Sequence, residues 1–507
     1  MSGSAPRWIA IPQPARFFPE GAAAPLWRPG SAEVVAESAV LEGEAARLRT
    51  ELGAQGIVAG SGSTIRLRVA PEGGSSDASA GRAPGDAVPA SAPGGAGASD
   101  ESWAIEVGDD VAIVVRSPAG AFRAGRQLLH NLRAQGGVPR GRVEGRPAVA
   151  ERGLHLDAAR KHYPAGWIAE LLHEAADVGI NVLQWHFSEN EGFRIASAAF
   201  PEVVSAAHVS RGEAEEIGRI ARGLHIAVVP SLDMPGHLRQ VLSAYPEHRL
   251  PPSPCGAEVD HALDITRDDA VDFALRLLDD MAEVFPGCTD WNVGGDEFVD
   301  FERMDDHPVL ADAARARFGP DATGFDLLTA FVNRVAAHLH DRGIGARVWN
   351  DGMLRGRVVP LDPRIVLTWW TNWNGGMRPV VDAVEAGLGL VNVNDALLYY
   401  VLGEKAGYRY PTAERIWAAD WHPGLFPALP DGTVQELRQP YPALLRGASF
   451  AIWSDDGEAQ TPEEVAAGVR APLRAMAERA WNGGSGLSLE EFVAMAEAIG
   501  VPTRADR

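Results

Sequence analysis

The segment Trp291-Asn292-Val293-Gly294-Gly295-Asp296-Glu297-Phe298 is a short apolar run that ends on two glycines and two adjacent carboxylates. Glycine gives the backbone room for a ligand, and the two acids place ionisable groups where a substrate could reach them. Adjacent acids are also common in solvated loops. The segment therefore predicts an active site only if the rest of the chain supplies groups that meet it.

Apolar runs that end on polar residues recur after Arg152, and helical patterns separate them. The eight runs cover residues 153–157, 181–188, 225–233, 290–297, 346–351, 364–370, 388–394 and 448–455. Helices are predicted over residues 164–178, 211–224, 268–285 and 325–342, and the first opens on Pro164, which suits an initial helical turn. Eight strand–helix units predict an α/β fold, a (β/α)8 TIM barrel with its active site at the carboxyl ends of the strands.

An open, doubly wound sheet is the alternative fold for the same pattern. That fold commonly carries a glycine-rich phosphate turn after its first strand, and none follows the first run here. Nearly every run also ends in side chains that could bind a ligand or exchange a proton, such as acids and histidines. Both observations favour the barrel.

The predicted domains are a small α+β domain over residues 1–150, a catalytic barrel over residues 151–482 and a C-terminal helical tail over residues 483–507 that packs on the barrel. In the first domain we expect strands at residues 63–69, 103–107 and 111–116 and a helix at residues 121–132. Residues 73–100 are almost entirely Gly, Ala, Ser, Pro and Asp, which predicts a disordered insertion.

Composition limits the classes of partner. The 507 residues are 46% hydrophobic and 22% charged, as in globular proteins, and the net charge of −22 argues against nucleic acid or anionic membranes as partners. The only cysteines, Cys255 and Cys288, are expected to be free thiols. Without a secretory or membrane-spanning pattern, the chain is predicted to be soluble and cytoplasmic. The sequence says nothing of the oligomeric state.

The predicted strand ends collect acids, histidines, one arginine and tryptophans. They are Asp157 and Arg160; His186, Glu189 and Asn190; Asp233 and His237; Asp296 and Glu297; Asn350 and Asp351; Trp370 and Trp373; Asn394 and Asp395; and Trp453 and Asp455. Carboxylates and arginine bind neighbouring hydroxyls, and indoles form apolar walls, so this set favours a neutral sugar. Glu297 is the candidate general acid of a glycosidase, because ionised Asp296 beside it would raise its pKa.

Four motifs, in this order, resemble those of family 20 glycoside hydrolases, the β-N-acetylhexosaminidases. They are Arg152-Gly153-Leu154-His155-Leu156-Asp157-Ala158-Ala159-Arg160, Asn181-Val182-Leu183-Gln184-Trp185-His186-Phe187, Asp233-Met234-Pro235-Gly236-His237 and Gly294-Gly295-Asp296-Glu297. The resemblance covers residues 152–455. It implies substrate-assisted catalysis, in which the 2-acetamido oxygen of the substrate attacks the anomeric carbon and forms an oxazolinium ion.

The resemblance also implies the role of each site residue. Asp296 would bind the acetamido N–H, and Glu297 would protonate the leaving oxygen and then activate water. Arg160 would bind ring hydroxyls, with Glu189, His237 and Asp455 also at the substrate. Asp233 and His237 would form the relay that orients the two acids. His186, weighed from the residues alone, is a further candidate behind them. Trp370, Trp373 and Trp453 would form walls, and either Tyr399 or Tyr400 would donate to the acetamido oxygen. The resemblance implies no cofactor and no metal ion.

Three positions depart from the family pattern. Glu189-Asn190-Glu191-Gly192-Phe193 stands where Asp-Asp-Gln-Gly-Trp is usual, Val401 and Leu402 replace an acid after the tyrosines, and Asp455 replaces Glu. These changes concern the O4 and O6 side of the sugar. The choice among GlcNAc, GalNAc and a 6-substituted sugar therefore stays open.

Three rival interpretations remain at this stage. The chain could be a sugar-binding barrel that has lost catalysis, or a metal-dependent hydrolase that uses His155, His186, His237 and Asp296. It could also be a retaining glycosidase with its own nucleophile, which requires a second carboxylate roughly 5 Å from the acid. Each rival predicts a different response to inhibitors and chelators.

Overall fold

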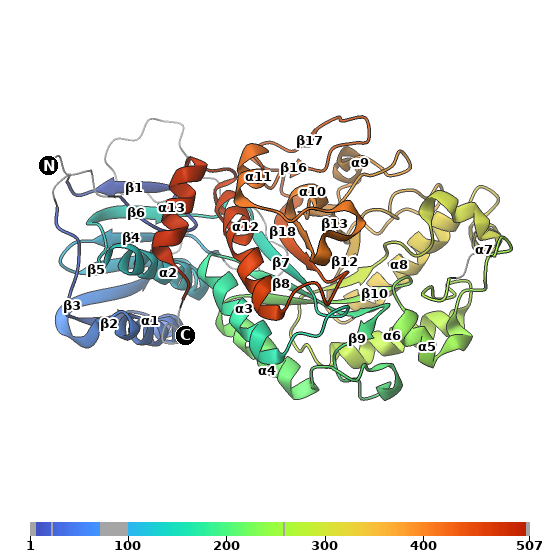
Figure 1. The fold of residues 1–507 in the computed structure, drawn as a ribbon, viewed down its shortest axis with the longest axis horizontal. Coiled ribbons are helices and arrows are strands. Elements are labelled where there is room, and N and C mark those ends of the chain that lie inside the picture. The colour runs from blue at the N-terminus through green and yellow to red at the C-terminus, as the bar shows by residue number, and fades with distance from the viewer. Residues whose placement is uncertain (1–6, 22–23, 71–99, 257–258, 503–507) are drawn as a thin grey trace. The chain divides into compact units, whose positions relative to one another are not determined.

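The computed structural model describes residues 7–21, 24–70, 100–256 and 259–502 (Figure 1). The chain divides into two compact units. The first consists of residues 1–150, 173–179 and 474–507, and the second of residues 151–172 and 180–473. Each unit is described separately below.

The first unit contains a six-stranded sheet with the strand order β1-β6-β4-β5-β3-β2. Its strands are β1 (Arg16–Pro19), β2 (Ser31–Ala36), β3 (Val58–Val69), β4 (Trp103–Val107), β5 (Val111–Val115) and β6 (Gly141–Gly145). The helices α1 (Glu42–Ala54) and α2 (Pro118–Gln135) contact the sheet and each other. Trp103, Ile105 and Val107 alternate with less buried residues along β4, which places one face of the sheet in the core.

The C-terminal helix α13 (Leu489–Ile499) packs against α2 in the first unit. The tail was predicted to pack on a barrel that ended at residue 482, and the C-terminal part of α13 contacts Arg474, which lies within those bounds, as well as α2. Phe492, Met495 and Ile499 form a buried stripe on α13, and such a stripe predicts a buried face without identifying the surface that covers it. Residues 73–99 of the predicted disordered insertion lie outside the described residues.

The second unit is a closed barrel of eight parallel strands, which confirms the predicted fold. The strands are β7 (Glu151–Asp157), β8 (Val182–Glu189), β10 (Ala227–Met234), β11 (Asp290–Gly294), β12 (Gly345–Trp349), β13 (Val366–Trp369), β14 (Gly389–Asn392) and β18 (Leu445–Trp453). They pair in this order, and β18 pairs with β7 to close the ring. Strands buried on both faces read as nearly continuous apolar runs, and all eight predicted runs correspond to these strands.

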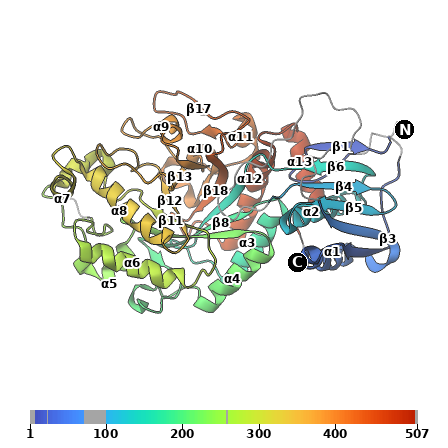
Figure 2. The same ribbon diagram turned by 180° about the vertical axis from the view of Figure 1, so that it is seen from behind.

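Helices surround the strands of the barrel (Figures 1 and 2). They are α3 (Ala165–Asp177), α4 (Arg211–Gly223), α5 (Arg239–Ala244), α6 (Asp268–Ala282), α7 (Pro308–Phe318), α8 (Gly324–His340), α9 (Val380–Glu385), α10 (Asp395–Leu398), α11 (Ala413–Ala418) and α12 (Pro462–Asn482). Four short strands lie in the loops, namely β9 (Gly192–Phe193), β15 (Tyr399–Val401), β16 (Leu425–Phe426) and β17 (Gln435–Glu436). No helix within the described residues has the length and apolar character needed to cross a membrane.

Two helices of the second unit, like α13 in the first, begin with reciprocal caps that fix their starting points. Ser210 and Glu213 form a capping box on α4, and Thr323 and Asp326 form one on α8. Asp326 also accepts hydrogen bonds from the three successive backbone N–H groups of residues 357–359. One buried carboxylate thus ties the start of α8 to the loop between β12 and β13.

Salt bridges close the amino-terminal end of the barrel. Arg347 on β12 forms a bidentate salt bridge with Glu151 at the start of β7, at 2.8 and 3.1 Å. Arg446 on β18 pairs with Asp290 at the start of β11, at 3.0 Å. The charges of these four side chains compensate one another. Ligands of this fold bind at the opposite end, where the carboxyl ends of the strands lie.

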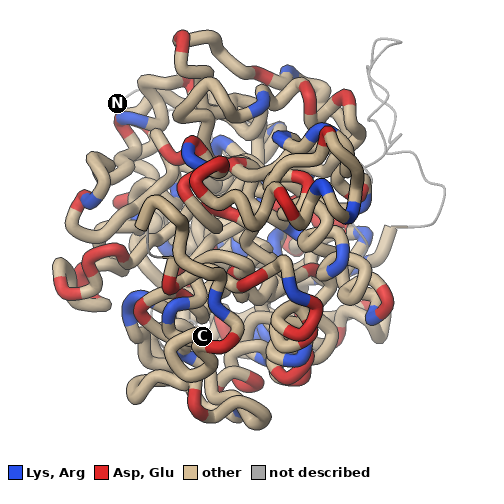
Figure 3. The backbone as a smooth tube through the Cα atoms, turned by 90° about the vertical axis from the view of Figure 1, so that its right-hand side faces the viewer, with Lys and Arg blue, Asp and Glu red and all other residues tan. Residues whose placement is uncertain are grey.

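Acidic and basic residues are interspersed over the described chain (Figure 3). In that view the basic residues form no continuous stripe of the kind that tracks a nucleic-acid backbone.

Candidate active site

The two adjacent acids follow the end of β11, and glycine is required there. Gly294 has φ +87°, and a Cβ at that position would lie 2.8 Å from the Cα of Asp233 on β10. Only a residue without a side chain allows the two strands to approach this closely. The close approach brings Asp233 of β10 beside the segment that carries Asp296 and Glu297.

Asp296 and Glu297 have opposite surroundings. Asp296 is 8% exposed, and no group among the described residues donates a hydrogen bond to its Oδ1 atom, which is buried. The Glu297 side chain is 54% exposed, and its backbone has φ +40°, in the left-handed region. Partial burial of the carboxyl group and the neighbouring Asp296 carboxylate raise the pKa of Glu297, although His237 opposes the shift. A raised pKa suits a carboxyl group that donates a proton.

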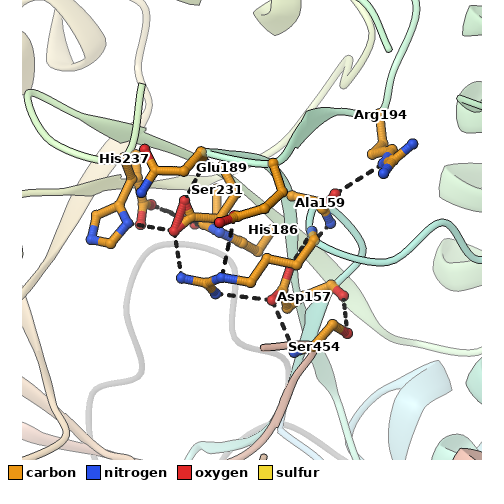
Figure 4. A network of polar contacts seen from close by, with 12 residues as sticks. Asp157, Ala159, His186, Glu189, Arg194, Ser231, His237 and Ser454 are labelled. Carbon is orange, nitrogen blue, oxygen red and sulfur yellow. Dashed lines mark hydrogen bonds and ion pairs between the residues drawn. The ribbon is translucent and has the colours of Figure 1, made fainter. Parts of the chain in front are cut away.

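His237 joins the acids to Glu189. Its Nε2 atom lies 3.4 Å from Oδ2 of Asp296 and 3.7 Å from Oε2 of Glu297, and its Nδ1 atom hydrogen-bonds to Glu189 (Figure 4). Burial lowers the pKa of His237, but Glu189 and Asp296 outweigh burial and raise it well above its usual value. Burial likewise opposes ionisation of Glu189, but His237 and Arg160 outweigh it and lower its pKa to about 2. His237 is thus a buried cation between carboxylates.

Arg160 is held by three carboxylates, one at the end of β7 and two at or just after the end of β8. Its Nη1 donates to Asp157 at 3.0 Å and its Nη2 to Glu189 at 2.5 Å, and its Nε lies 3.5 Å from Glu191. Asp157 in turn accepts hydrogen bonds from the backbone N–H groups of Arg160 and Ser454 (Figure 4). The guanidinium also lies 5.4 Å from the ring of Trp453. Its orientation is therefore fixed before any ligand binds.

The region enclosed by the carboxyl ends of the barrel strands is called the bowl below. Aromatic rings line the side of the bowl formed by β12, β13, β15 and β18. Trp349, Trp370, Tyr399 and Trp453 belong to one buried cluster. Trp370 and Tyr399 are nearly parallel, at an interplanar angle of 4° and a centroid distance of 5.9 Å. Trp453 lies 5.8 Å from both Tyr399 and Trp349. These rings form rigid apolar walls.

The structure decides between the two tyrosines. Tyr399 faces the aromatic cluster, whereas the hydroxyl of Tyr400 accepts a hydrogen bond from Gln460 and its ring stacks on Tyr410. Neighbouring residues of a strand point to opposite faces, so only one of the two can face the bowl. Of the two candidates, Tyr399 is therefore the one whose side chain lies with the aromatic cluster.

Two other predicted site residues are exposed to solvent. Trp373 is 53% exposed, unlike Trp370 and Trp453, which are buried, and its Nε1 donates to Asp395 at 2.7 Å. Its ring lies 4.5 Å from that of Trp370, so it stands at the exposed edge of the aromatic cluster, and its role as a wall stays a prediction. Asp455 is also exposed, and burial of part of its surface raises its pKa while Arg160 opposes that shift.

Asp233 and His186 lie beneath the acids. Ser231 donates to Asp233 at 3.2 Å and bonds to Nδ1 of His186 at 3.1 Å. Burial and the Asp296 carboxylate raise the pKa of Asp233 well above its usual value. His155 bonds to Gln184, and in the described part of the chain no three His, Cys, Asp or Glu side chains are arranged to hold a metal ion.

Comparison with known proteins decides the family. The profile described as "Glycosyl hydrolase family 20, catalytic domain" matches residues 150–484. The chain belongs to glycosyl hydrolase family 20. It is thus a glycoside hydrolase, and the resemblance found in its motifs is confirmed.

Relatives that match most of this chain include a lacto-N-biosidase and a β-N-acetylhexosaminidase. A lacto-N-biosidase of Bifidobacterium bifidum is 27% identical over 387 residues, which cover 76% of this chain but 33% of that protein. A β-N-acetylhexosaminidase of Cellulomonas fimi is 26% identical over 426 residues, covering 78% of this chain and 77% of the relative. The chain thus spans only about a third of the length of the bifidobacterial protein.

Solved structures of family 20 share the fold. The β-N-acetylhexosaminidase of Bacteroides fragilis superposes with a TM-score of 0.71 at 22% identity, covering 96% of this chain and 93% of the other. That of Streptomyces coelicolor superposes with a TM-score of 0.70 at 22% identity, covering 97% and 96%. The match extends over both units of the chain.

Some residues at this family 20 site received no role from the sequence. Asp351 accepts hydrogen bonds from Glu297 and Trp370, Asp395 accepts them from Trp373 and Tyr408, and Trp349 joins the aromatic cluster. Asp351 and Asp395 stood among the strand-end residues, which was the available signal. Tyr408 lies in a loop and had none.

Proposed function

We propose that this protein is an exo-acting β-N-acetylhexosaminidase that removes a terminal β-linked N-acetylhexosamine by substrate-assisted, retaining catalysis. The contrast between the two adjacent acids carries the proposal. Asp296 is buried and offers a free acceptor oxygen among the described residues, whereas Glu297 is half exposed with a raised pKa. One acid is suited to hold an amide N–H, and the other to exchange a proton with a bound ligand.

The first step forms the oxazolinium ion. The carbonyl oxygen of the 2-acetamido group attacks the anomeric carbon while the bond to the leaving oxygen breaks, and Glu297 transfers its proton to that oxygen. Oδ1 of Asp296 accepts the acetamido N–H and stabilises the positive charge that develops on the amide. The substrate supplies the nucleophile, so the enzyme needs no carboxylate that attacks the anomeric carbon.

The second step reverses these roles. Glu297 is now a carboxylate and takes a proton from water, which attacks the anomeric carbon and opens the oxazolinium ring. Two displacements at the same carbon retain its configuration. Asp296 keeps its contact with the amide throughout.

The surrounding residues hold these acids and the sugar in place. Protonated His237 lies between Glu189 and the two acids and limits their movement. Arg160, already oriented by Asp157 and Glu189, offers its remaining N–H groups to ring hydroxyls. Asp233 and His186 support the pair from below.

The aromatic cluster suits the acetamido group and the sugar ring. Trp370 and Trp453 supply apolar walls, and the hydroxyl of Tyr399 donates to the acetamido oxygen. Trp373 and Asp455 lie at the exposed edge, where they meet the outer parts of the substrate. The activity named for the Cellulomonas fimi relative supports an N-acetylhexosaminide substrate, GlcNAc or GalNAc.

The test is release of nitrophenol from a nitrophenyl β-N-acetylglucosaminide by the purified protein. We expect Glu297→Gln to lower kcat about a thousandfold or more and Asp296→Asn about a hundredfold or more. Glu216→Gln is the control, because Glu216 is an exposed carboxylate on α4 that pairs with Arg219 and has no contact with the proposed site. A thiazoline mimic of the oxazolinium ion should inhibit competitively.

Other outcomes identify the rivals. Binding of the sugar without hydrolysis would indicate a barrel that has lost catalysis. Loss of activity with a strong chelator would indicate a metal-dependent hydrolase. Equal turnover of glycosides with and without the 2-acetamido group would indicate an enzyme nucleophile.

A further inference from the structure

Asp351 is a buried carboxyl group that has no role in the steps above. It follows β12 and is 2% exposed. Its Oδ2 atom accepts a hydrogen bond from the backbone N–H of Glu297 at 3.3 Å, and its Oδ1 atom accepts one from Nε1 of Trp370 at 3.1 Å. One rigid side chain thus connects the acid with the aromatic wall.

Joining the barrel strands does not explain this carboxyl group. The preceding residue, Asn350, already performs that function, because its Nδ2 donates to the Thr371 carbonyl at 2.8 Å and its Oδ1 accepts from the Trp370 backbone at 2.9 Å. Burying a carboxyl group is costly unless its contacts compensate. The contacts of Asp351 are made to Glu297 and to the Trp370 indole.

The backbone of Glu297 needs such a contact. Its φ of +40° is a conformation that costs a residue with a Cβ about 1–2 kcal/mol. Strained residues keep their conformation when the surroundings over-determine it. The Asp351 carboxyl fixes the N–H of this residue, and therefore the direction in which the half-exposed side chain leaves the backbone.

The charges around Asp351 are mostly acidic. Asp296 and Glu297 face it from the end of β11, cationic His237 lies beyond them on the segment after β10, and Arg355 contacts its backbone carbonyl at 3.5 Å. Burial, followed by Asp296 and Glu297, raises the pKa of Asp351 to about 8. The group is therefore mostly neutral at pH 7, and it adds little repulsion to the acid pair.

We propose that Asp351 is a positioning residue that fixes Glu297 relative to the Trp370 wall, so that the proton of Glu297 reaches the leaving oxygen. The inference rests on the proposed function of Glu297 as the acid. A displacement of about 1 Å in a reacting group lowers rates about a hundredfold, so loss of this link should weaken proton donation first.

Two substrates separate proton donation from general damage. A sugar leaving group departs only when it is protonated, whereas dinitrophenolate departs without a proton. For Asp351→Asn we expect kcat/KM to fall about a hundredfold on a β-linked N-acetylglucosamine disaccharide and less than about tenfold on the dinitrophenyl glycoside. The amide keeps one acceptor and the shape of the side chain, but it cannot accept both hydrogen bonds.

Asp395→Asn is the matched control. Asp395 is also a buried strand-end carboxyl that accepts an indole N–H, from Trp373, but its other hydrogen bond comes from Tyr408 rather than from Glu297. We expect this control to lower the rates on both substrates by the same factor. Trp370→Phe removes the indole N–H that Asp351 accepts together with part of the apolar wall, so both rates should fall. The rate on the disaccharide should still fall further than the rate on the dinitrophenyl glycoside, which keeps the test available if Asp351→Asn does not fold.

Equal losses on the two substrates in Asp351→Asn, or in Trp370→Phe when the first variant does not fold, would overturn the inference. A wild-type protein that hydrolyses neither substrate would instead overturn the proposed function. The two failures are therefore distinguishable.

Discussion

The Nη2 atom of Arg160 lies 2.5 Å from Oε1 of Glu189, and that same oxygen hydrogen-bonds to His237. A carboxylate one methylene longer than the family's usual aspartate thus contacts two cations at once. Removing its charge while keeping its shape, as in Glu189→Gln, leaves both buried cations without this partner. We expect the free energy of unfolding at pH 7 to fall by about 3 kcal/mol, measured by urea titration. Glu191→Gln, at a half-exposed carboxylate beside Arg160, should change it by less than about 0.5 kcal/mol.

The same pair predicts a pH dependence of stability. The folded pKa of Glu189, about 2, lies below its unfolded value, so its contribution is fully present above the unfolded value of about 4.3 and is lost as the pH falls towards 2. The difference in unfolding free energy between wild type and Glu189→Gln should therefore shrink from about 3 kcal/mol at pH 6 to nearly zero at pH 2. His237 is protonated in both states over most of this range. A difference that stayed constant with pH would contradict the assignment.

Two neighbouring glycines separate backbone strain from steric conflict. Gly294 and Gly295 both have φ +87°, but a Cβ on Gly294 would meet Asp233 at 2.8 Å, whereas one on Gly295 would meet the flexible end of Met353 at 3.4 Å. Gly294→Ala should lower the free energy of unfolding by about 3 kcal/mol and Gly295→Ala by about 1 kcal/mol. Thermal unfolding of the two variants measures this ordering. Equal losses would mean that β10 moves aside without cost.

The two adjacent tyrosines provide a test of the proposed acetamido contact. Tyr399→Phe removes a hydroxyl that faces the aromatic cluster, and we expect kcat on a nitrophenyl β-N-acetylglucosaminide to fall about a hundredfold. Tyr400→Phe removes a hydroxyl bonded to Gln460 outside the bowl and should leave kcat within about threefold of wild type. The reverse ordering would mean that the acetamido group lies elsewhere.

Trp373 and Trp370 should differ in what their removal affects. Trp373 is 53% exposed, so Trp373→Ala should change the free energy of unfolding by less than about 1 kcal/mol while raising KM for a disaccharide substrate. Trp370→Ala should cost about 3–5 kcal/mol, because that ring is buried. Calorimetry and steady-state kinetics on both variants check the contrast. An unchanged KM in Trp373→Ala would remove it from the substrate site.

The barrel was predictable because parallel strands buried on both faces appear in the sequence as apolar runs. The ends of these runs gave the site, including Arg160, Glu189 and Glu297, since the carboxyl ends of all strands meet at one side of a barrel. The first unit was harder. Helix α1 was missed because alanines and two leucines supply its few apolar residues, which leaves almost no periodic signal.

Contacts that depend on exact placement were not predictable. Tyr399 and Tyr400 are distinguished only by the register of β15 against β18, and Trp373 is distinguished from Trp370 only by the path of the loop that carries it. The stripe on α13 predicted a buried helix without identifying α2 as its partner. The cytoplasmic location, inferred from the sequence, stays a prediction.

Glu297 and His237 both have backbone conformations that favour glycine, with φ of +40° and +55°. At these two positions the most stable residue and the most useful residue are therefore different. A glycine at position 297 would relax the chain and raise the free energy of unfolding by about 1 kcal/mol, while abolishing proton donation. Selection for thermal stability alone would thus be expected to erode two positions on which the proposed hydrolysis depends.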